Sequence, residues 1–230
     1  MEQSLLNKYI VPLAIVVAGI FVAAAIYFGD GSSGPVASRV ENPTQSKIDI
    51  ASVTEKDHII GSSNADLVIV EYSDTECPFC KVFHKSMHQV VLDYNGRVAW
   101  VYRHFPIAQL HTKAAKEAEA TECAAELGGN QSFWKYIDKL FETTNSNDSL
   151  DLKELPKIAT AVGLNEAAFN ACLSSGKYTE SVGKSITEAV KAGARGTPYS
   201  VIITRDDQKI VINGAEPLLN VKSKIDALLK

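Results

Sequence analysis

The chain has 230 residues, and its size and charge exclude several classes of protein. This length allows one or two domains, and 46% apolar with 22% charged residues excludes a wholly disordered chain. The formal net charge is −4, so no basic excess exists to bind a nucleic-acid backbone. Four cysteines are too few for a disulfide-rich miniprotein, although two of them lie three positions apart.

The N-terminal residues 1–29 predict a short cytoplasmic tip and a membrane anchor. Ile10–Phe28 contains 19 residues without a charge, and as a helix it would be roughly 28 Å long, close to the hydrocarbon thickness of a bilayer. Tyr9 and Tyr27 stand at its two ends, where aromatic side chains favour the membrane interface. A cleaved signal peptide is the alternative, but its apolar region would be shorter and followed closely by a cleavage site. The composition of residues 30–53 predicts a flexible linker.

Residues 54–230 predict one α/β domain. Runs rich in β-branched residues predict strands, and 3.6-residue periodicity between capping signals predicts helices. The expected strands are 67–72, 98–105, 199–204 and 209–213, and the expected helices are 78–92, 112–127, 132–143, 152–162, one starting after Asn165, 178–192 and 218–229. The order is therefore β-α-β, a helical insertion at about residues 106–192, and then β-β-α.

Cys77 and Cys80 form a C-x-x-C pair at the predicted junction of the first strand and its helix. Unpaired N–H groups and the dipole at a helix N-terminus favour a thiolate, so we expect a lowered pKa for Cys77, the attacking sulfur. Cys80 lies one turn later and is expected to be buried. The spacing lets the two sulfurs form a bond, and such a pair exchanges through a mixed disulfide. Pro78 occupies the first helical position, where proline fits.

Two other interpretations of this pair are open. Cys77, Cys80 and His84 have the spacing of three zinc ligands, but structural zinc sites usually bring a second close pair of ligands. Cys123 and Cys172 are isolated from each other and from the first pair. The second alternative is an inert structural disulfide. A redox-active dithiol fits best, and the sequence predicts no metal site and no cofactor.

Six segments of the chain resemble the DsbA-like thioredoxin-fold oxidoreductases, in the same order. They are VIVEYSDTECPFCKVFH, YRHFPI, HTKAAKEAEATECA, FWKYIDKLF, GLNEAAFNACLSSGKY and GARGTPYSVII. The resemblance covers residues 54–230, nearly all of the expected folded part. It implies a thioredoxin fold with an inserted helical domain, and thiol–disulfide exchange on extracytoplasmic protein substrates.

The resemblance also implies roles for individual residues. Cys77 would be the nucleophile and Cys80 the resolving thiol. Thr197 and Pro198 correspond to the cis-proline loop, which lies against the dithiol and pairs with substrate backbone; a trans proline opening a strand is the alternative. Glu71 corresponds to an acidic residue beneath the active site, where a raised pKa would assist proton transfer from Cys80. The alternative for Glu71 is a strand residue that faces outward.

The residues between the two cysteines depart from the best-known oxidants of this family, which carry Pro-His. Here the pair is Pro78-Phe79, and the missing histidine argues against a very oxidising potential. The ring of Phe79 adds an apolar surface beside Cys77 that is suited to unfolded chains. We therefore expect Pro78 and Phe79 to contact the substrate together with the cis-proline loop.

Relatives with these segments often join the cysteines that correspond to Cys123 and Cys172. Such a bond would close a loop of about 50 residues and contribute roughly 4 kcal/mol by the chain-entropy estimate. Two buried free thiols are the alternative. His104 and His111 match family positions and are expected to pack, whereas His58 and His88 follow no pattern.

The sequence therefore predicts a membrane-anchored extracytoplasmic oxidoreductase that forms disulfides in secreted or surface proteins. The resemblance implies a monomer in the bacterial cytoplasmic membrane, with its C-terminal domain facing the periplasm or the cell exterior. It also implies reoxidation by a membrane quinone-linked partner of the DsbB or VKOR type. A reductase or isomerase of the same fold, and a redox-inactive chaperone-like binding module, are the alternatives.

Overall fold

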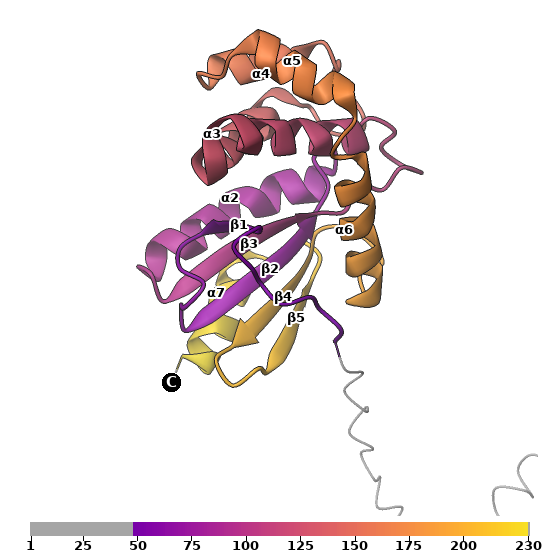
Figure 1. Ribbon diagram of the computed structural model, residues 1–230. Coiled ribbons are helices and arrows are strands. Elements are labelled where there is room, and N and C mark those ends of the chain that lie inside the picture. The colour runs from indigo at the N-terminus through magenta and orange to yellow at the C-terminus, as the bar shows by residue number, and fades with distance from the viewer. Residues whose placement is uncertain (1–47, 230) are drawn as a thin grey trace, which may run out of the picture. The chain divides into compact units, whose positions relative to one another are not determined.

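The computed structural model describes residues 48–229, which form a central sheet with helices on both faces (Figure 1). The strands are β1 (His58–Ile60), β2 (Leu67–Ser73), β3 (Val98–His104), β4 (Tyr199–Thr204) and β5 (Lys209–Asn213). The helices are α2 (Pro78–Asp93), α3 (Ala114–Thr143), α4 (Glu154–Ala161), α5 (Glu166–Ser175), α6 (Thr179–Lys191) and α7 (Leu218–Leu228). The expected anchor at Ile10–Phe28 lies outside the described residues. Within residues 48–229, every helix is too short or too polar to cross a membrane.

The five strands form one mixed sheet in the order β1-β3-β2-β4-β5. β2 lies at its centre, parallel to β3 and antiparallel to β4. Its sequence LVIVEYS is almost continuously apolar because both of its faces are covered. Glu71 interrupts this run and stands opposite Tyr102 on one side and Ser200 on the other. The centre of the sheet therefore carries one acidic side chain into the interior.

Helices cover the two faces of the sheet unequally. α2, α7 and the C-terminal half of α3 contribute to one apolar core, and α6 packs on the opposite face. A third apolar core joins α3 to α4 and α5. Figure 1 shows α4 and α5 on the side of α2 that faces away from the sheet. The predicted order of strand, helix, strand, helical insertion and hairpin with a terminal helix is confirmed.

Two local features differ from the sequence-based expectation. β1 was not expected, because three residues carry too little periodicity to indicate a strand; it exists by antiparallel pairing with β3. The two helices expected at 112–127 and 132–143 join as α3, but Gly128 and Gly129 have non-helical backbone angles. Gly129 has a φ of 70°, which glycine adopts without strain. The predicted interruption therefore exists as a kink within one long element.

Candidate active site

The C-x-x-C pair lies at the N-terminus of α2, just after the carboxyl end of β2. Cys77 is the N-cap residue, and Pro78 occupies the first helical position. Both cysteines are free thiols. Cys77 is 6% exposed, whereas Cys80 is fully buried one turn deeper. Cys77 is therefore the sulfur that a substrate can reach, and Cys80 lies behind it.

The pKa of Cys77 is lowered to about 6. The thiol of Cys80 contributes most to this shift, which burial of Cys77 opposes. The backbone N–H groups of Phe79 and Cys80 and the side chain of Thr197 lower the pKa further. Cys77 has no side-chain cap hydrogen bond, so the first N–H groups of α2 stay available to the sulfur. The expected helix effect is present, although the partner thiol is the larger cause.

The pKa of Cys80 is shifted in the opposite direction, well above the ordinary value of a thiol. Burial is the main cause, followed by the thiol and the negative charge of Cys77 and then by the charge of Glu71. The backbone N–H of Asp74 lies 3.5 Å from the Cys80 sulfur. One sulfur of the pair is thus ionised near neutral pH, and the other holds its proton.

The loop before β4 contacts the dithiol although it lies 120 residues further along the chain. The Thr197–Pro198 peptide bond is cis. The Cys77 sulfur lies 3.4 Å from the carbonyl oxygen of Thr197, which accepts a hydrogen bond from it when the thiol is protonated. The carbonyl of Pro198 accepts from the N–H of Gly214 at 3.0 Å, which ties the loop to the end of β5. The loop is therefore held against the more accessible sulfur.

Glu71 is fully buried on β2 and faces the interior on the dithiol side of the sheet. Burial raises its pKa to about 7, and the negative charge of Cys77 adds to the shift. Neither carboxyl oxygen has a hydrogen-bond partner among the described residues. The prediction that Glu71 is buried is confirmed, and the alternative of an outward-facing strand residue is wrong. A carboxyl group with this pKa can both accept and donate a proton near pH 7.

The acidic turn before the cysteines anchors the site to the helical insertion. Asp74 accepts hydrogen bonds from the loop after β3, and Glu76 accepts them from the loop after α3. The donors are Ile107 N (2.8 Å) and His111 Nδ1 (2.9 Å) for Asp74, and Thr144 Oγ1 (2.7 Å), Ser149 N (2.9 Å) and Leu150 N (3.2 Å) for Glu76. Both acids are buried, and a turn of polar residues gives no sign of this in the sequence.

Glu117 on α3 is a further buried acid near this turn, which the sequence analysis did not single out. It accepts a hydrogen bond from the hydroxyl of Thr75 at 2.6 Å. Burial raises its pKa to about 8, and the neighbouring charge of Glu76 contributes. Glu117 lies in an alanine-rich stretch with the pattern of an amphipathic helix. Its position on one face of that helix is the only feature of the sequence that indicates burial.

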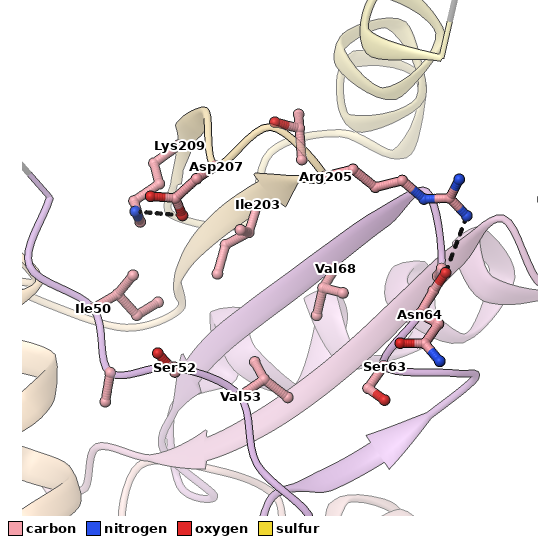
Figure 2. A pocket seen from close by; sticks show the side chains of 13 residues that line it. Ile50, Ser52, Val53, Ser63, Asn64, Val68, Ile203, Arg205, Asp207 and Lys209 are labelled. Carbon is pink, nitrogen blue, oxygen red and sulfur yellow. Dashed lines mark hydrogen bonds and ion pairs between the residues drawn. The ribbon is translucent and has the colours of Figure 1, made fainter.

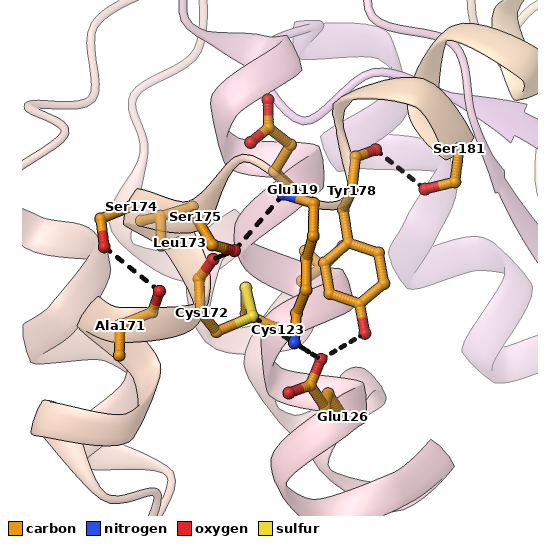
Figure 3. Close-up of a disulfide and its surroundings, with 12 residues drawn as sticks. Glu119, Cys123, Glu126, Ala171, Cys172, Leu173, Ser174, Ser175, Tyr178 and Ser181 are labelled. Atoms are coloured by element: carbon orange, nitrogen blue, oxygen red, sulfur yellow. Dashed lines mark hydrogen bonds and ion pairs between the residues drawn. A yellow bond between two sulfur atoms is a disulfide. The ribbon is translucent and has the colours of Figure 1, made fainter.

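Cys123 and Cys172 form a disulfide that joins α3 to α5 (Figure 3). Cys123 is fully buried, and both residues belong to the apolar core of the insertion. The hydroxyl of Tyr178 donates to Glu126 at 2.7 Å beside this bond. The pair lies within helices rather than at a helix N-terminus, so no free N–H groups face either sulfur.

The histidines bind acidic partners. His58 and His104 both contact one oxygen of Glu122, at 3.0 and 2.9 Å, and His84 lies 2.6 Å from Asp138. In residues 48–229, the group of three potential metal ligands that converges within 4.8 Å contains no cysteine. The zinc interpretation of the C-x-x-C pair with His84 is therefore wrong.

A cavity of about 600 Å³ lies on another part of the domain (Figure 2). It is lined by the segment before β1, by the loop before β2 and by the turn between β4 and β5. Arg205 donates to the carbonyl oxygen of Asn64 at 3.1 Å, and Lys209 pairs with Asp207 at 2.7 Å. Because its lining includes neither cysteine of the C-x-x-C pair, this cavity is separate from the dithiol.

Comparison with known proteins agrees with this geometry. A family model described as thioredoxin matches residues 53–217. Among solved structures, Pseudomonas aeruginosa DsbA2 is 29% identical, with a TM-score of 0.63 over 75% of this chain and 94% of that chain. BdbD from Bacillus subtilis, in its oxidised form, is 21% identical, with a TM-score of 0.66 over 79% of this chain and 97% of that chain. At that lower identity, BdbD supports the fold alone.

Curated relatives match over a shorter stretch. The Na(+)/H(+) antiporter NhaA 3 of Salinispora tropica is 31% identical over 144 residues, which is 63% of this chain and 21% of that protein. NhaA 1 of Mycolicibacterium vanbaalenii is 34% identical over 116 residues, or 50% of this chain and 18% of that protein. The chain thus spans about a fifth of the length of the curated relatives it matches.

Proposed function

Because the chain belongs to the thioredoxin family and is a DsbA-like thiol–disulfide oxidoreductase, we propose that it forms disulfides in extracytoplasmic proteins. Cys77 exchanges disulfides with the substrate. Cys80 leaves when the substrate attacks Cys77, and it resolves the mixed disulfide in the reverse direction. The observation that carries this proposal is the split in acidity between the two sulfurs, one lowered to a pKa of about 6 and the other raised. A stabilised thiolate favours the reduced form of the pair, which makes the oxidised form a stronger oxidant.

The reaction cycle starts from the Cys77–Cys80 disulfide. A substrate thiolate attacks the Cys77 sulfur, a substrate–Cys77 bond forms, and Cys80 leaves as a thiolate. A second substrate thiolate then attacks the substrate sulfur of this mixed disulfide, which forms the substrate disulfide and releases the Cys77 thiolate. The pair gains two electrons and the substrate loses two. Cys80 regains a proton because its pKa is high, and Glu71 is the buried acid placed to supply it.

The surroundings of Cys77 suit an extended, apolar substrate. Phe79 is 65% exposed and Val82 is 63% exposed, three residues further on the same helix. The cis Thr197–Pro198 loop lies against Cys77, with the Thr197 carbonyl oxygen 3.4 Å from its sulfur. A substrate strand adjacent to its cysteine would pair with the backbone of this loop. Pro78 and Phe79 would contact the side chains of that strand.

We further propose that Ile10–Phe28 anchors the chain in the bacterial cytoplasmic membrane, with the folded domain on the periplasmic or external side. The Cys123–Cys172 disulfide supports this orientation, because such bonds persist in oxidising compartments. Each turnover leaves a dithiol, so the cycle needs an external electron acceptor. A quinone-linked membrane protein would take the two electrons.

The test measures direction as well as activity. The full-length chain is equilibrated with glutathione redox buffers, and its rates of oxidising reduced ribonuclease and of reducing insulin are compared. We expect ribonuclease oxidation, a reduction potential well above the roughly −270 mV of thioredoxin, and loss of turnover in Cys77→Ser. A potential near that of thioredoxin, with fast insulin reduction, would identify a reductase instead.

A second variant separates catalysis from binding. Cys80→Ser, mixed with a substrate that carries a disulfide, should accumulate a mixed disulfide, because the Cys77 thiolate attacks that bond, one substrate thiolate leaves, and no second thiol of the pair releases Cys77. Mass spectrometry of the trapped species identifies the sulfur that attacks. Trapping on no substrate, together with a Cys77→Ser variant that behaves as wild type in all three assays, would support a redox-inactive binding module.

A further inference from the structure

Three potential metal ligands converge between α2 and α3, outside the redox site. Nε2 of His84 and Nε2 of His88 lie 2.6 and 2.8 Å from Oδ1 of Asp138. The two nitrogens are 3.3 Å apart. The structure assigns to these three residues a binding site for a divalent transition-metal ion with the ligand preferences of Zn²⁺.

The spacing of the three donor atoms is close to that of a zinc site. Zinc binds histidine nitrogen and carboxylate oxygen at about 2.0–2.2 Å, so neighbouring donors of a tetrahedral site are roughly 3.3–3.4 Å apart. The two His nitrogens already have this separation. The Asp138 oxygen is closer to both, and a shift of its carboxylate by roughly 0.7–0.8 Å completes the triangle. The Asp138 side chain is 40% exposed and is free to make that shift.

The positions of the ligands in the chain explain why they converge. His84 and His88 are four residues apart on α2, so their side chains lie on the same face of the helix. Asp138 approaches them from α3. Two histidines spaced in this way with a carboxylate from a neighbouring helix provide three protein ligands and leave a fourth position open. His88 and Asp138, the two more exposed ligands, border the open side.

A second histidine pair in the same domain shows that a shared carboxylate alone is not enough. His58 and His104 also contact one oxygen, that of Glu122. In residues 48–229, the donor atoms of His58, His104 and Glu122 do not form a group within 4.8 Å of one another, as those of His84, His88 and Asp138 do. At Asp138, the two imidazole nitrogens also lie 3.3 Å from each other, so the three donor atoms converge on one point.

The surroundings hold the histidine rings in place. The His84 side chain is only 5% exposed, and its ring centre lies 5.0 Å from that of Trp100 and 4.7 Å from that of Phe141. His88 meets Trp100 edge-on at 5.2 Å. Fixed rings lose little freedom on binding a metal, and the apolar wall closes the inner side of the site. A bound ion would join α2, which carries the dithiol, to α3 of the insertion.

The experiment is a Zn²⁺ titration of the full-length chain by calorimetry. The background carries Cys77→Ser and Cys80→Ser, because free thiols bind zinc themselves. We expect one Zn²⁺ per chain, binding at least 100-fold weaker in His88→Ala and in Asp138→Asn, and no more than a threefold change in the control His58→Ala. A thermal unfolding midpoint that rises with Zn²⁺ in the background chain, but not in His88→Ala, provides a second readout.

Two results would overturn the site: no saturable Zn²⁺ binding in the background chain, or equal binding in His88→Ala, Asp138→Asn and the control. Circular dichroism checks that each variant is folded. Should His88→Ala fail to fold, Asp138→Asn decides, because its side chain is partly exposed and nearly unchanged in volume. Co²⁺ loaded into the background chain without the two thiols gives an independent test. A visible cobalt absorption that is equally strong in His88→Ala and Asp138→Asn would reject the site at His84.

Discussion

The two cysteine pairs of this domain differ in sequence spacing, position on their helices and acidity. Cys77 and Cys80 are three residues apart at a helix N-terminus, beside a buried acid and a cis-proline loop. Cys123 and Cys172 are separated by 49 positions and lie inside helices of the insertion. The first pair has one ionised and one protonated sulfur near neutral pH. The second lies in the apolar core of the insertion, and the carboxylate of Glu126 is 3.9 Å from the Cys172 sulfur.

The difference shows that the surroundings of a cysteine determine whether its disulfide exchanges with other thiols or persists. An uncapped helix end directs N–H groups at Cys77, and the partner thiol donates to it. A thiolate in such a position is a good leaving group, so its disulfide is easily exchanged. Cys123 is fully buried in a core of apolar side chains, and the Cys172 sulfur faces the carboxylate of Glu126 at 3.9 Å, which disfavours a thiolate there. One pair therefore serves chemistry and the other serves stability.

The largest expected effect comes from removing the second pair. The double variant Cys123→Ala/Cys172→Ala should lower the free energy of unfolding by about 4 kcal/mol, from the entropy of the loop it opens. Guanidinium unfolding of the oxidised chain measures this loss. The equilibrium constant of the Cys77–Cys80 pair with glutathione should change by less than threefold. A large shift in that constant would mean that the two pairs are coupled and would break the comparison.

The next effect concerns the acid beside the exchangeable pair. Glu71→Gln keeps the shape of the side chain but cannot transfer a proton, so substrate oxidation at about pH 7 should slow by roughly 10²-fold. Stopped-flow measurement of the oxidation rate of a thiol peptide reports this change. Glu117→Gln is the matched control, because Glu117 is also buried with a raised pKa but does not influence Cys80. Equal slowing in both variants would assign the effect to lost stability of the fold rather than to proton transfer.

Stability against pH should also distinguish the reduced from the oxidised chain. Cys77 has a pKa of about 6 in the folded reduced chain and about 8.5 when unfolded. The unfolded chain therefore binds more protons between these values, so the reduced form gains stability as pH rises through this window and loses it as pH falls towards 6. The oxidised form lacks this thiol. The difference between the two forms should grow by about 2–3 kcal/mol from about pH 5 to pH 8.

Glu71 acts with the opposite sign but does so in both redox forms. Its pKa rises from an ordinary value to about 7 on folding, so stability falls as pH increases towards 7. The comparison of reduced with oxidised chain removes most of this contribution. Guanidinium unfolding of both forms at the two pH values makes the measurement, and reduced Cys77→Ser is the control. Parallel pH profiles for the reduced and oxidised wild type would contradict the lowered pKa of Cys77.

Much of this arrangement could be predicted from the sequence, because the signals were local or came as ordered segments. The strand of apolar residues before Cys77, the helix that Pro78 opens and the β-hairpin after Pro198 each lie within a short stretch. The pairing of Cys123 with Cys172 came from the resemblance to a family. Spacing alone could not indicate it, because it depends on how α5 packs on α3.

Contacts between distant segments were missed for the same physical reason. The buried hydrogen bonds of Glu76 join it to a loop about 70 residues away, and polar turn residues give no sign of such burial. The convergence of His84 and His88 with Asp138 also needs the packing of two helices. The spacing of the two histidines on one helix face was the only local signal. Tertiary packing decides whether such a signal becomes a site.

The smallest predicted effect concerns the exposed aromatic ring of Phe79 and its contact with protein substrates of the Cys77–Cys80 pair. Phe79→Ala removes an apolar ring that is 65% exposed beside Cys77, so kcat/KM for an unfolded protein substrate should fall by about tenfold, mainly through KM. Leu92→Ala is the matched control, because Leu92 is 73% exposed on the same helix but lies at its other end. Exchange with glutathione should be unchanged in both variants, since that small thiol has no apolar chain for the ring to contact. If glutathione exchange slows as much as protein oxidation in Phe79→Ala, the ring acts on the reactivity of Cys77 and not on substrate binding.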